Sequence, residues 1–311
     1  MARGHRKQHY VAQSYLLAWA DPNVPSHHDP YVWSFPAEGG DARKKAPKKI
    51  FHEIDMYTLP VEGGGRDVTI EKRLNKLESL FSQVRRHKLD QRKALETDDE
   101  LAILTFAAAQ YFRTPAMRKH LRGQWSPVVN SMERMKASVE RMTPEQRKAA
   151  ARPPFRNDGM SMTEDDVRQL VAFPLQHTIM SNIQTVVPHL TRFDLALLCT
   201  NEANPFITSD NPCVWFDPAG HKRLPVHRGP ALMYPTLEIT MPLSPTCLLL
   251  LNKKGVAGYL EIPDIHVAEL NRRTRAHAAE YFVSRTNAAD PFWYIRGEPP
   301  RDDEIGPSIL Y

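Results

Sequence analysis

The chain has 311 residues, of which 41% are hydrophobic and 25% charged, a composition typical of a soluble globular protein with a substantial core. Lysine and arginine total 41 against 36 acidic residues, and this net charge of +5 permits nucleic-acid binding without demanding it. No secretory signal is visible, no apolar run is long enough to cross a membrane, and the three cysteines include no CxxC pair. We therefore expect a cytoplasmic protein without a membrane partner or a disulfide scaffold.

The first half of the chain is predicted to be mainly helical. Residues 8–20 have the apolar spacing of a helix, which would place His9 and Gln13 on one face, whereas residues 31–35 alternate like a strand. The segment 48–59 looks extended or irregular. Further helices are predicted over 68–87, 97–114 and 125–148, and Pro115 permits an end or a kink between the last two.

The second half changes from helices to strands. Residues 152–160 are the best candidate for an internal boundary within a single domain of residues 1–311, and Thr163 caps a helix expected to pass Gln184. Short β-like runs follow at 193–200, 206–208, 214–216, 237–241 and 247–251, then a helix at 265–277 and a strand at 281–284. This order predicts an α+β fold, in which a helical N-terminal half packs on a small mixed or antiparallel sheet contributed mainly by the C-terminal half.

Polar residues lie within apolar sequence at four places that are far apart along the chain. They are His9 with Gln13, Glu78, Gln110 with Arg113, and the run Ser209, Asp210 and Asn211. Apolar neighbours predict burial, and buried polar groups are unfavourable unless they satisfy one another. These residues therefore either form an internal structural network or line a chemical site.

The same segments resemble a widespread bacterial family, domain of unknown function 4238. The resemblance rests on HYVAQSYL at 9–16, the helix with Glu78, QYFRTP at 110–115, FITSDNP at 206–212 and PLSP at 242–245. It covers nearly the whole chain, although Ala12 and Ser14 stand where the family usually has proline and an aromatic residue. The resemblance implies a single architecture and a bacterial cytoplasmic setting, and it assigns no chemistry.

Arg113 and Gln110 occupy a helix that is otherwise almost entirely apolar. A buried arginine needs an anionic partner, because an unpaired buried charge is strongly destabilising. One interpretation is a structural ion pair with Glu78 or Asp210. The other is a guanidinium that binds an anionic substrate through two parallel hydrogen bonds.

His9 and Asp210 have the same two interpretations. His9 either bonds local backbone or transfers protons, since histidine changes charge near neutral pH. Asp210 either accepts backbone amides in a tight turn, or acts as a general base or metal ligand together with His9 and Glu78. No HExxH, phosphate-loop or dinucleotide-binding motif is present, so the signal for a metal is weak and the cofactor stays open, with a divalent ion as the candidate.

The sequence-based hypothesis is a hydrolase that cleaves phosphodiester bonds in nucleic acid, most plausibly RNA. His9, Arg113, Asp210 and Glu78 would form the catalytic set, with Arg113 stabilising the charge that grows on the phosphate. Gln13, Gln110, Ser209 and Asn211 would position the substrate. The alternative hypothesis is a non-catalytic sensor of a small anionic ligand such as a nucleotide. A third interpretation is that these residues only brace the fold.

Overall fold

A computed structural model describes residues 6–25, 27–61, 63, 65–150 and 162–295 of the chain. The helices are α1 (Gln13–Leu16), α2 (Thr69–His87), α3 (Thr97–Phe112), α4 (Pro115–Glu140), α5 (Pro144–Ala150), α6 (Glu164–Ala172), α7 (Pro174–Leu190) and α8 (Asp264–Ala276). The boundary predicted at 152–160 lies outside the described residues. Within them, none of the helices combines the length and apolar character needed to cross a bilayer.

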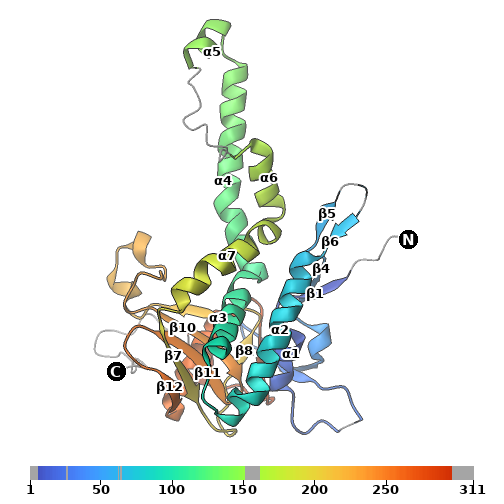
Figure 1. Ribbon diagram of the computed structural model, residues 1–311, viewed down its shortest axis with the longest axis vertical. Coiled ribbons are helices and arrows are strands. Elements are labelled where there is room, and N and C mark those ends of the chain that lie inside the picture. Colours follow the sequence, from blue (N-terminus) through green and yellow to red (C-terminus); the bar gives the residue numbers. More distant parts are fainter. Residues whose placement is uncertain (1–5, 26, 62, 64, 151–161, 296–311) are drawn as a thin grey trace.

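Two principal sheets lie beside the helices, which confirms the predicted α+β class (Figure 1). The mixed five-stranded sheet has the order β12-β7-β11-β10-β9, and the antiparallel four-stranded sheet has the order β3-β2-β13-β8. The strands of the first sheet are β7 (Asp194–Cys199), β9 (Val214–Phe216), β10 (Glu238–Ser244), β11 (Cys247–Asn252) and β12 (Gly258–Glu261). Those of the second are β2 (Val32–Pro36), β3 (Arg43–Lys45), β8 (Thr208–Ser209) and β13 (Tyr281–Ser284).

The five-stranded sheet is buried on both faces. Because side chains alternate along a strand, Leu249 and Leu251 point to the face in the main core, which also contains apolar side chains of α2, α3 and α7. Leu248 and Leu250 point to the other face, where Val267 and Leu270 of α8 pack. Both faces are apolar, so most of β11 appears in sequence as the uninterrupted apolar run 247–251, not as an alternating strand.

Capping and apolar spacing explain the central helices. On α2, Leu74, Phe81 and Val84 are buried along one stripe, and Phe81 stacks on Phe106 of α3 with ring centroids 3.9 Å apart. Helix α3 begins with a capping box in which Glu96 and Asp99 satisfy each other's backbone amides. The helix ends at Phe112, and Thr114 caps α4, which starts at Pro115.

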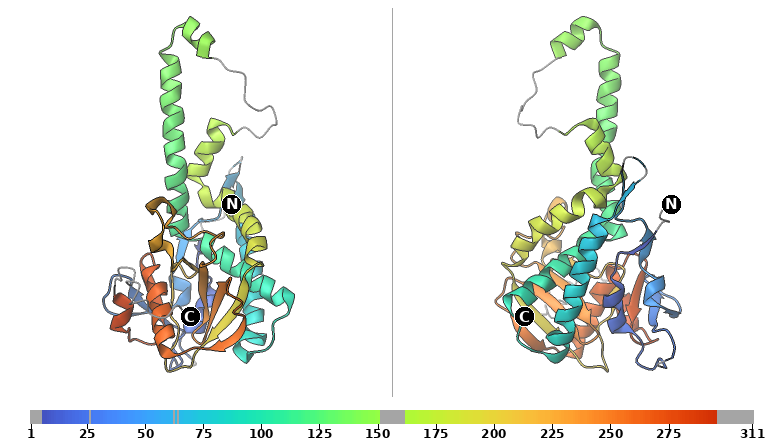
Figure 2. Two further views of the ribbon diagram at one scale, coloured as in Figure 1. Left: turned by 90° about the vertical axis from the view of Figure 1, so that its left-hand side faces the viewer. Right: turned by 45° about the vertical axis from the view of Figure 1, so that its right-hand side comes forward.

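Helix α4 leaves the body of the molecule as a long arm (Figures 1 and 2). Its outer half carries α5 at the tip, and α6 packs alongside it near the body. Arg168 of α6 pairs with Glu133 of α4 at 2.8 Å, and the Arg122 guanidinium donates to the carbonyl oxygens of Val171 and Ala172 at 3.1 and 3.0 Å. Among the residues of α4, only Leu121 is buried.

Three predicted helices are wrong in their extent. The helix expected over 125–148 starts instead at Pro115 and ends at Glu140, and the separate helix α5 follows from Pro144. The helix expected over 8–20 is instead strand β1 (Lys7–His9), followed by α1 and a 3-10 turn over Leu17–Trp19. Strand β1 pairs antiparallel with β4 (His52–Ile54), so the backbone of His9 belongs to a sheet ladder. The helix expected from Thr163 past Gln184 breaks at Phe173, since Pro174 cannot donate to the preceding turn and starts α7.

Candidate functional site

The predicted polar residues divide between two places, of which the first is a small pocket between β1 and α2. Its volume is about 130 Å³. We call it the β1–α2 pocket, and its lining residues are Lys7, Gln8, His9, Gln13, Tyr57, Glu71, Leu74, Asn75 and Glu78. Three residues predicted for the site, His9, Gln13 and Glu78, therefore do come together, although His9 and Gln13 lie on a strand and a helix and not on one helix face.

Helix α2 supplies one polar wall of this pocket. Glu71, Asn75 and Glu78 follow one another at helical spacing, so their side chains project from the same face as Leu74. The Glu71 carboxylate, in the first turn of α2, is partly buried and accepts a hydrogen bond from Gln8 at 2.8 Å. A polar stripe beside an apolar stripe on α2 is the signal that could have revealed this wall.

Gln8 fixes the opposite wall, and sequence reasoning missed it. It is 2% exposed, and all of its polar atoms are engaged. Its amide nitrogen donates to the Thr58 hydroxyl at 2.9 Å and to Glu71, while its oxygen accepts from the backbone amide of Tyr57 at 2.6 Å. The side chain thereby ties β1, α2 and the chain after β4 into a rigid frame.

Arg113 lies directly behind the pocket and is fully buried. Its guanidinium donates to the Tyr10 carbonyl at 2.6 Å, to the His9 carbonyl at 3.1 Å and to the Glu78 carboxylate at 2.8 Å. The Tyr57 hydroxyl donates in turn to the Arg113 carbonyl at 2.8 Å. This arrangement matches the structural ion pair considered above, with Glu78 and not Asp210 as the partner.

Two groups that line the pocket have strongly perturbed pKa values: burial raises the pKa of the Tyr57 phenol and lowers that of the His9 imidazole. Burial lowers the pKa of His9 from 6.5 to about 4, and the neighbouring charges of His52 and Arg113 act in the same direction. The rings of His9 and His52 meet edge to face, with centroids 5.3 Å apart. Within the described part of the chain, the Nε2 atom of His9 is buried and has no hydrogen-bond partner.

This perturbation predicts that the protein loses stability in mild acid. Because the pKa of folded His9 is lowered, the unfolded chain binds more protons between pH 6.5 and about 4, so the stabilisation present above this window is lost as the pH falls through it. The unfolding free energy of His9→Gln should therefore fall less than that of the wild type as the pH is lowered from 7 to 4. The expected difference is about 1–2 kcal/mol, after discounting for the partial exposure of His9. Urea unfolding at a series of pH values measures this difference. Parallel curves for the two proteins would contradict it, and His27→Gln in an exposed loop is the control.

The second place contains Ser209, Asp210 and Asn211, where β8 meets β13. The Asp210 carboxylate accepts the backbone amides of Ala279, Glu280 and Tyr281 at 2.7, 2.7 and 3.0 Å. Burial raises the pKa of Asp210, and these three donors act in the opposite direction. Asp210 does not line the β1–α2 pocket, and its geometry is that of the backbone-bonding turn considered above.

The two neighbours of Asp210 are also engaged with backbone. The Ser209 hydroxyl accepts from the Asn211 amide at 3.1 Å, and the Asn211 side chain donates to the His277 carbonyl at 3.1 Å.

Gln110 lies apart from both places, fully buried, and neither of its amide atoms has a partner among the described residues. Those residues contain no group of three or more His, Cys, Asp or Glu side chains arranged to hold a metal ion.

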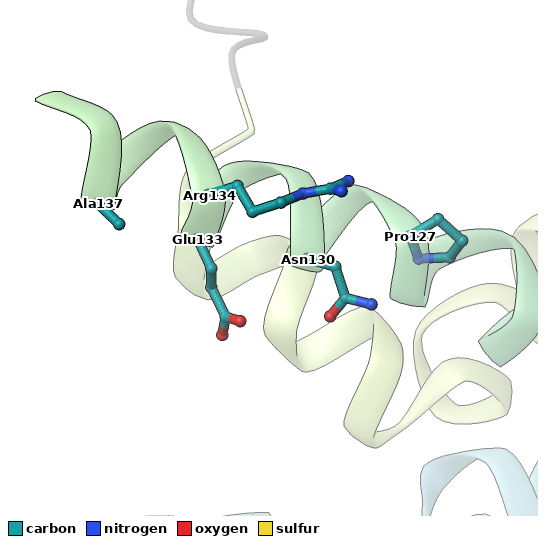
Figure 3. A pocket seen from close by; sticks show the side chains of 5 residues that line it. All are labelled: Pro127, Asn130, Glu133, Arg134 and Ala137. Atoms are coloured by element: carbon teal, nitrogen blue, oxygen red, sulfur yellow. The ribbon is translucent and has the colours of Figure 1, made fainter.

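A second hollow of about 500 Å³ lies on the arm, lined by Pro127, Asn130, Glu133, Arg134 and Ala137. All five residues belong to α4, and Figure 3 shows Arg134 lying along the helix toward Pro127, while Asn130 and Glu133 point to the other side. Since one helix face supplies the whole lining, this hollow gathers no converging polar groups. The β1–α2 pocket is the better candidate site.

Comparison with known proteins identifies a family for this chain. No curated protein and no solved structure matches it. The sequence profile of the family described as "protein of unknown function (DUF4238)" matches residues 7–288, a span that includes both the β1–α2 pocket and the Asp210 turn. The chain belongs to this DUF4238 family.

Proposed function

We propose that this protein binds a small polar ligand in the β1–α2 pocket. The observation that carries the proposal is the buried, unpartnered Nε2 atom of His9 beside a pocket in which Gln8, Glu71 and Glu78 are held by hydrogen bonds. Buried polar atoms are normally satisfied, so a group left without a partner in a polar pocket is a natural contact for a ligand or an ordered water. The fixed Gln8 and Glu78 side chains mean that little ordering is needed on binding.

The two carboxylates of the pocket, those of Glu71 and Glu78, outnumber its one lysine, Lys7, and favour a ligand that supplies hydrogen-bond donors. Glu71 and Glu78 each have a second carboxylate oxygen beyond the one that bonds Gln8 or Arg113. His9 is neutral at pH 7 because its pKa is about 4, so it does not add positive charge. An amine, a guanidinium or the donor edge of a nucleobase therefore suits the pocket better than the small anionic ligand of the alternative hypothesis drawn from the sequence.

The state of Arg113 supports binding over phosphate chemistry. A guanidinium that stabilises a phosphate must present free N–H groups to it. Arg113 is completely buried and already donates to three oxygen acceptors within the fold. A bracing role for Arg113 is the simpler account, with the ligand contacts coming from His9, Glu71 and Glu78.

Ligand binding is tested by thermal stabilisation. We expect agmatine or guanosine at millimolar concentration to raise the melting temperature of the full chain, because a ligand that binds only the folded state stabilises it against unfolding. Inorganic phosphate should leave the melting temperature unchanged. Glu71→Gln and His9→Gln should abolish the shift, whereas Glu100→Gln on the exposed side of α3 should keep it. Stabilisation by phosphate without any effect of the donor-rich probes would contradict the proposal.

Phosphodiester hydrolysis of RNA is the second candidate function. One observation favours it: a neutral imidazole, the Lys7 ammonium group and two carboxylates line the same pocket, and together these groups could transfer protons and hold a phosphate. The same protein samples, incubated with mixed RNA and DNA at several pH values with and without divalent ions, decide the question. Shortened RNA that depends on His9 would favour hydrolysis, while intact nucleic acid throughout would count against it.

The cellular setting is part of the proposal. Three free cysteines among the described residues are compatible with a reducing compartment, and we propose the cytoplasm.

A further inference from the structure

Two of the cysteines, distant in sequence, are directly opposite each other in the five-stranded sheet. Cys199 ends β7 and Cys247 begins β11, and the antiparallel register pairs these two residues. Side chains of directly opposed residues project from the same face of a sheet. The 3-10 turn over Leu89–Gln91 and the following Arg92 lie near this face, because the charges of Asp90 and Arg92 both act on the Cys247 thiol.

The hydrogen bonding of the strands brings this pair unusually close. The Thr200 amide donates to the Thr246 carbonyl at 3.1 Å, while the Cys199 carbonyl points away from β11 and accepts from Ile262 at 3.1 Å. Cys199 and Cys247 are therefore a non-hydrogen-bonded pair, the closer of the two kinds, with Cα atoms about 4.5 Å apart. A disulfide needs Cα atoms about 4.4–6.8 Å apart, so the backbone is already within range.

The two sulfur atoms have different chemical character. Both thiols are free, and the Cys199 thiol donates a hydrogen bond to the Leu197 carbonyl at 3.6 Å. Interaction with the Cys247 thiol and the charge of the Arg92 guanidinium lower the pKa of Cys199, while interaction with Cys199 and burial raise the pKa of Cys247. Cys199 is thus the sulfur that reacts first as a thiolate, and Cys247 is placed to attack it afterwards.

Access limits the reagent to a small oxidant. Cys199 and Cys247 are 2% and 4% exposed. Arg92 and Glu261, which form an ion pair and whose charges both act on Cys199, have side chains more than half exposed. The side chains of Arg92 and Glu261 therefore separate Cys199 from solvent. Local motion of Arg92 can admit a molecule the size of hydrogen peroxide.

We propose that Cys199 and Cys247 form an oxidisable dithiol, which hydrogen peroxide converts into an intramolecular disulfide. The Cys199 thiolate attacks one peroxide oxygen, the O–O bond breaks, and the sulfenic acid of Cys199 and one water form after proton transfer. The Cys247 sulfur then attacks the Cys199 sulfur, the S–O bond breaks, and hydroxide leaves with the Cys247 proton as a second water. Two thiols are oxidised to one disulfide, and one peroxide is reduced to two waters.

Differential alkylation of the full chain tests this proposal. Reduced protein is treated with hydrogen peroxide while folded, then denatured, alkylated and digested for mass spectrometry. We expect one linked pair of peptides containing Cys199 and Cys247, reversed by dithiothreitol, with Cys213 still alkylated. Cys213 is the internal control because it is equally buried, at 2% exposure, and burial raises its pKa. Alkylation of all three cysteines, or oxidation of Cys213 at the rate of Cys199, would overturn the proposal.

Two variants separate the steps. Cys247→Ser removes the second thiol, so the sulfenic acid of Cys199 should persist and react with a dimedone probe. Cys213→Ala should still form the disulfide. If Cys247→Ser does not fold, the relative rates of Cys199 and Cys213 oxidation in the wild-type chain still decide the outcome.

Discussion

Arg113→Met should lower the free energy of unfolding by about 3–5 kcal/mol, because it leaves the Glu78 carboxylate without its cation in a largely buried position. The carbonyl oxygens of His9 and Tyr10 would also lose their guanidinium donors. Methionine approximates the length of the aliphatic stem, so lost charge and hydrogen bonding dominate the effect. Urea unfolding monitored by far-ultraviolet circular dichroism measures it.

Arg118 provides the matched control for this experiment. It follows on α4 and pairs with Glu53, but the side chains are 26% and 34% exposed, so Arg118→Met should change stability by less than about 1 kcal/mol. The double variant Arg113→Met/Glu78→Met should be less destabilised than the sum of its single variants, since it leaves no unpaired charge. A change below 1 kcal/mol for Arg113→Met would show that this guanidinium is not a brace and would reopen a role in substrate binding.

Asp210→Asn should have the second largest effect, a loss of about 2–4 kcal/mol. The substitution keeps the shape of the side chain but replaces one acceptor oxygen with an NH₂ group facing backbone amides that also donate. The amides of Ala279, Glu280 and Tyr281 then compete for one remaining oxygen at the start of β13. The same unfolding experiment measures the loss.

Asp290→Asn is the control for Asp210. Asp290 is exposed and accepts a single amide, that of Phe292 at 2.9 Å, so its substitution should reduce stability by about 1 kcal/mol or less. Unchanged stability of Asp210→Asn together with loss of ligand binding would assign Asp210 to a site, whereas a large loss of stability with binding retained would assign it to the scaffold.

Elements with strong local signals were predictable from sequence. Helices α2, α3 and α8 lie close to their predicted ranges because apolar spacing and first-turn acids are properties of a single segment. Strand β11 was visible as an apolar run. The helix expected over 8–20 failed because β1 is specified by its partner β4, more than forty residues away, and no local pattern records that pairing.

The burial of residues in the candidate site was also predictable, because burial follows from the local sequence, whereas their contacts do not. Polar residues in apolar context identified Arg113 and Asp210 as buried, but burial alone does not reveal which acceptors or donors surround a group. The Arg113 partner was narrowed to Glu78 or Asp210, and the structure selects Glu78. Gln8 and the pairing of Cys199 with Cys247 depend on strand register, which the sequence leaves undetermined.

The arm carries its tip far from the pocket. Helix α4 starts two residues after Arg113, next to the pocket wall, and its 26 residues rise about 39 Å along the helix axis. A macromolecule held at the far end would therefore stand clear of the pocket mouth. Contacts made at the tip would leave the mouth of the pocket open to a small ligand.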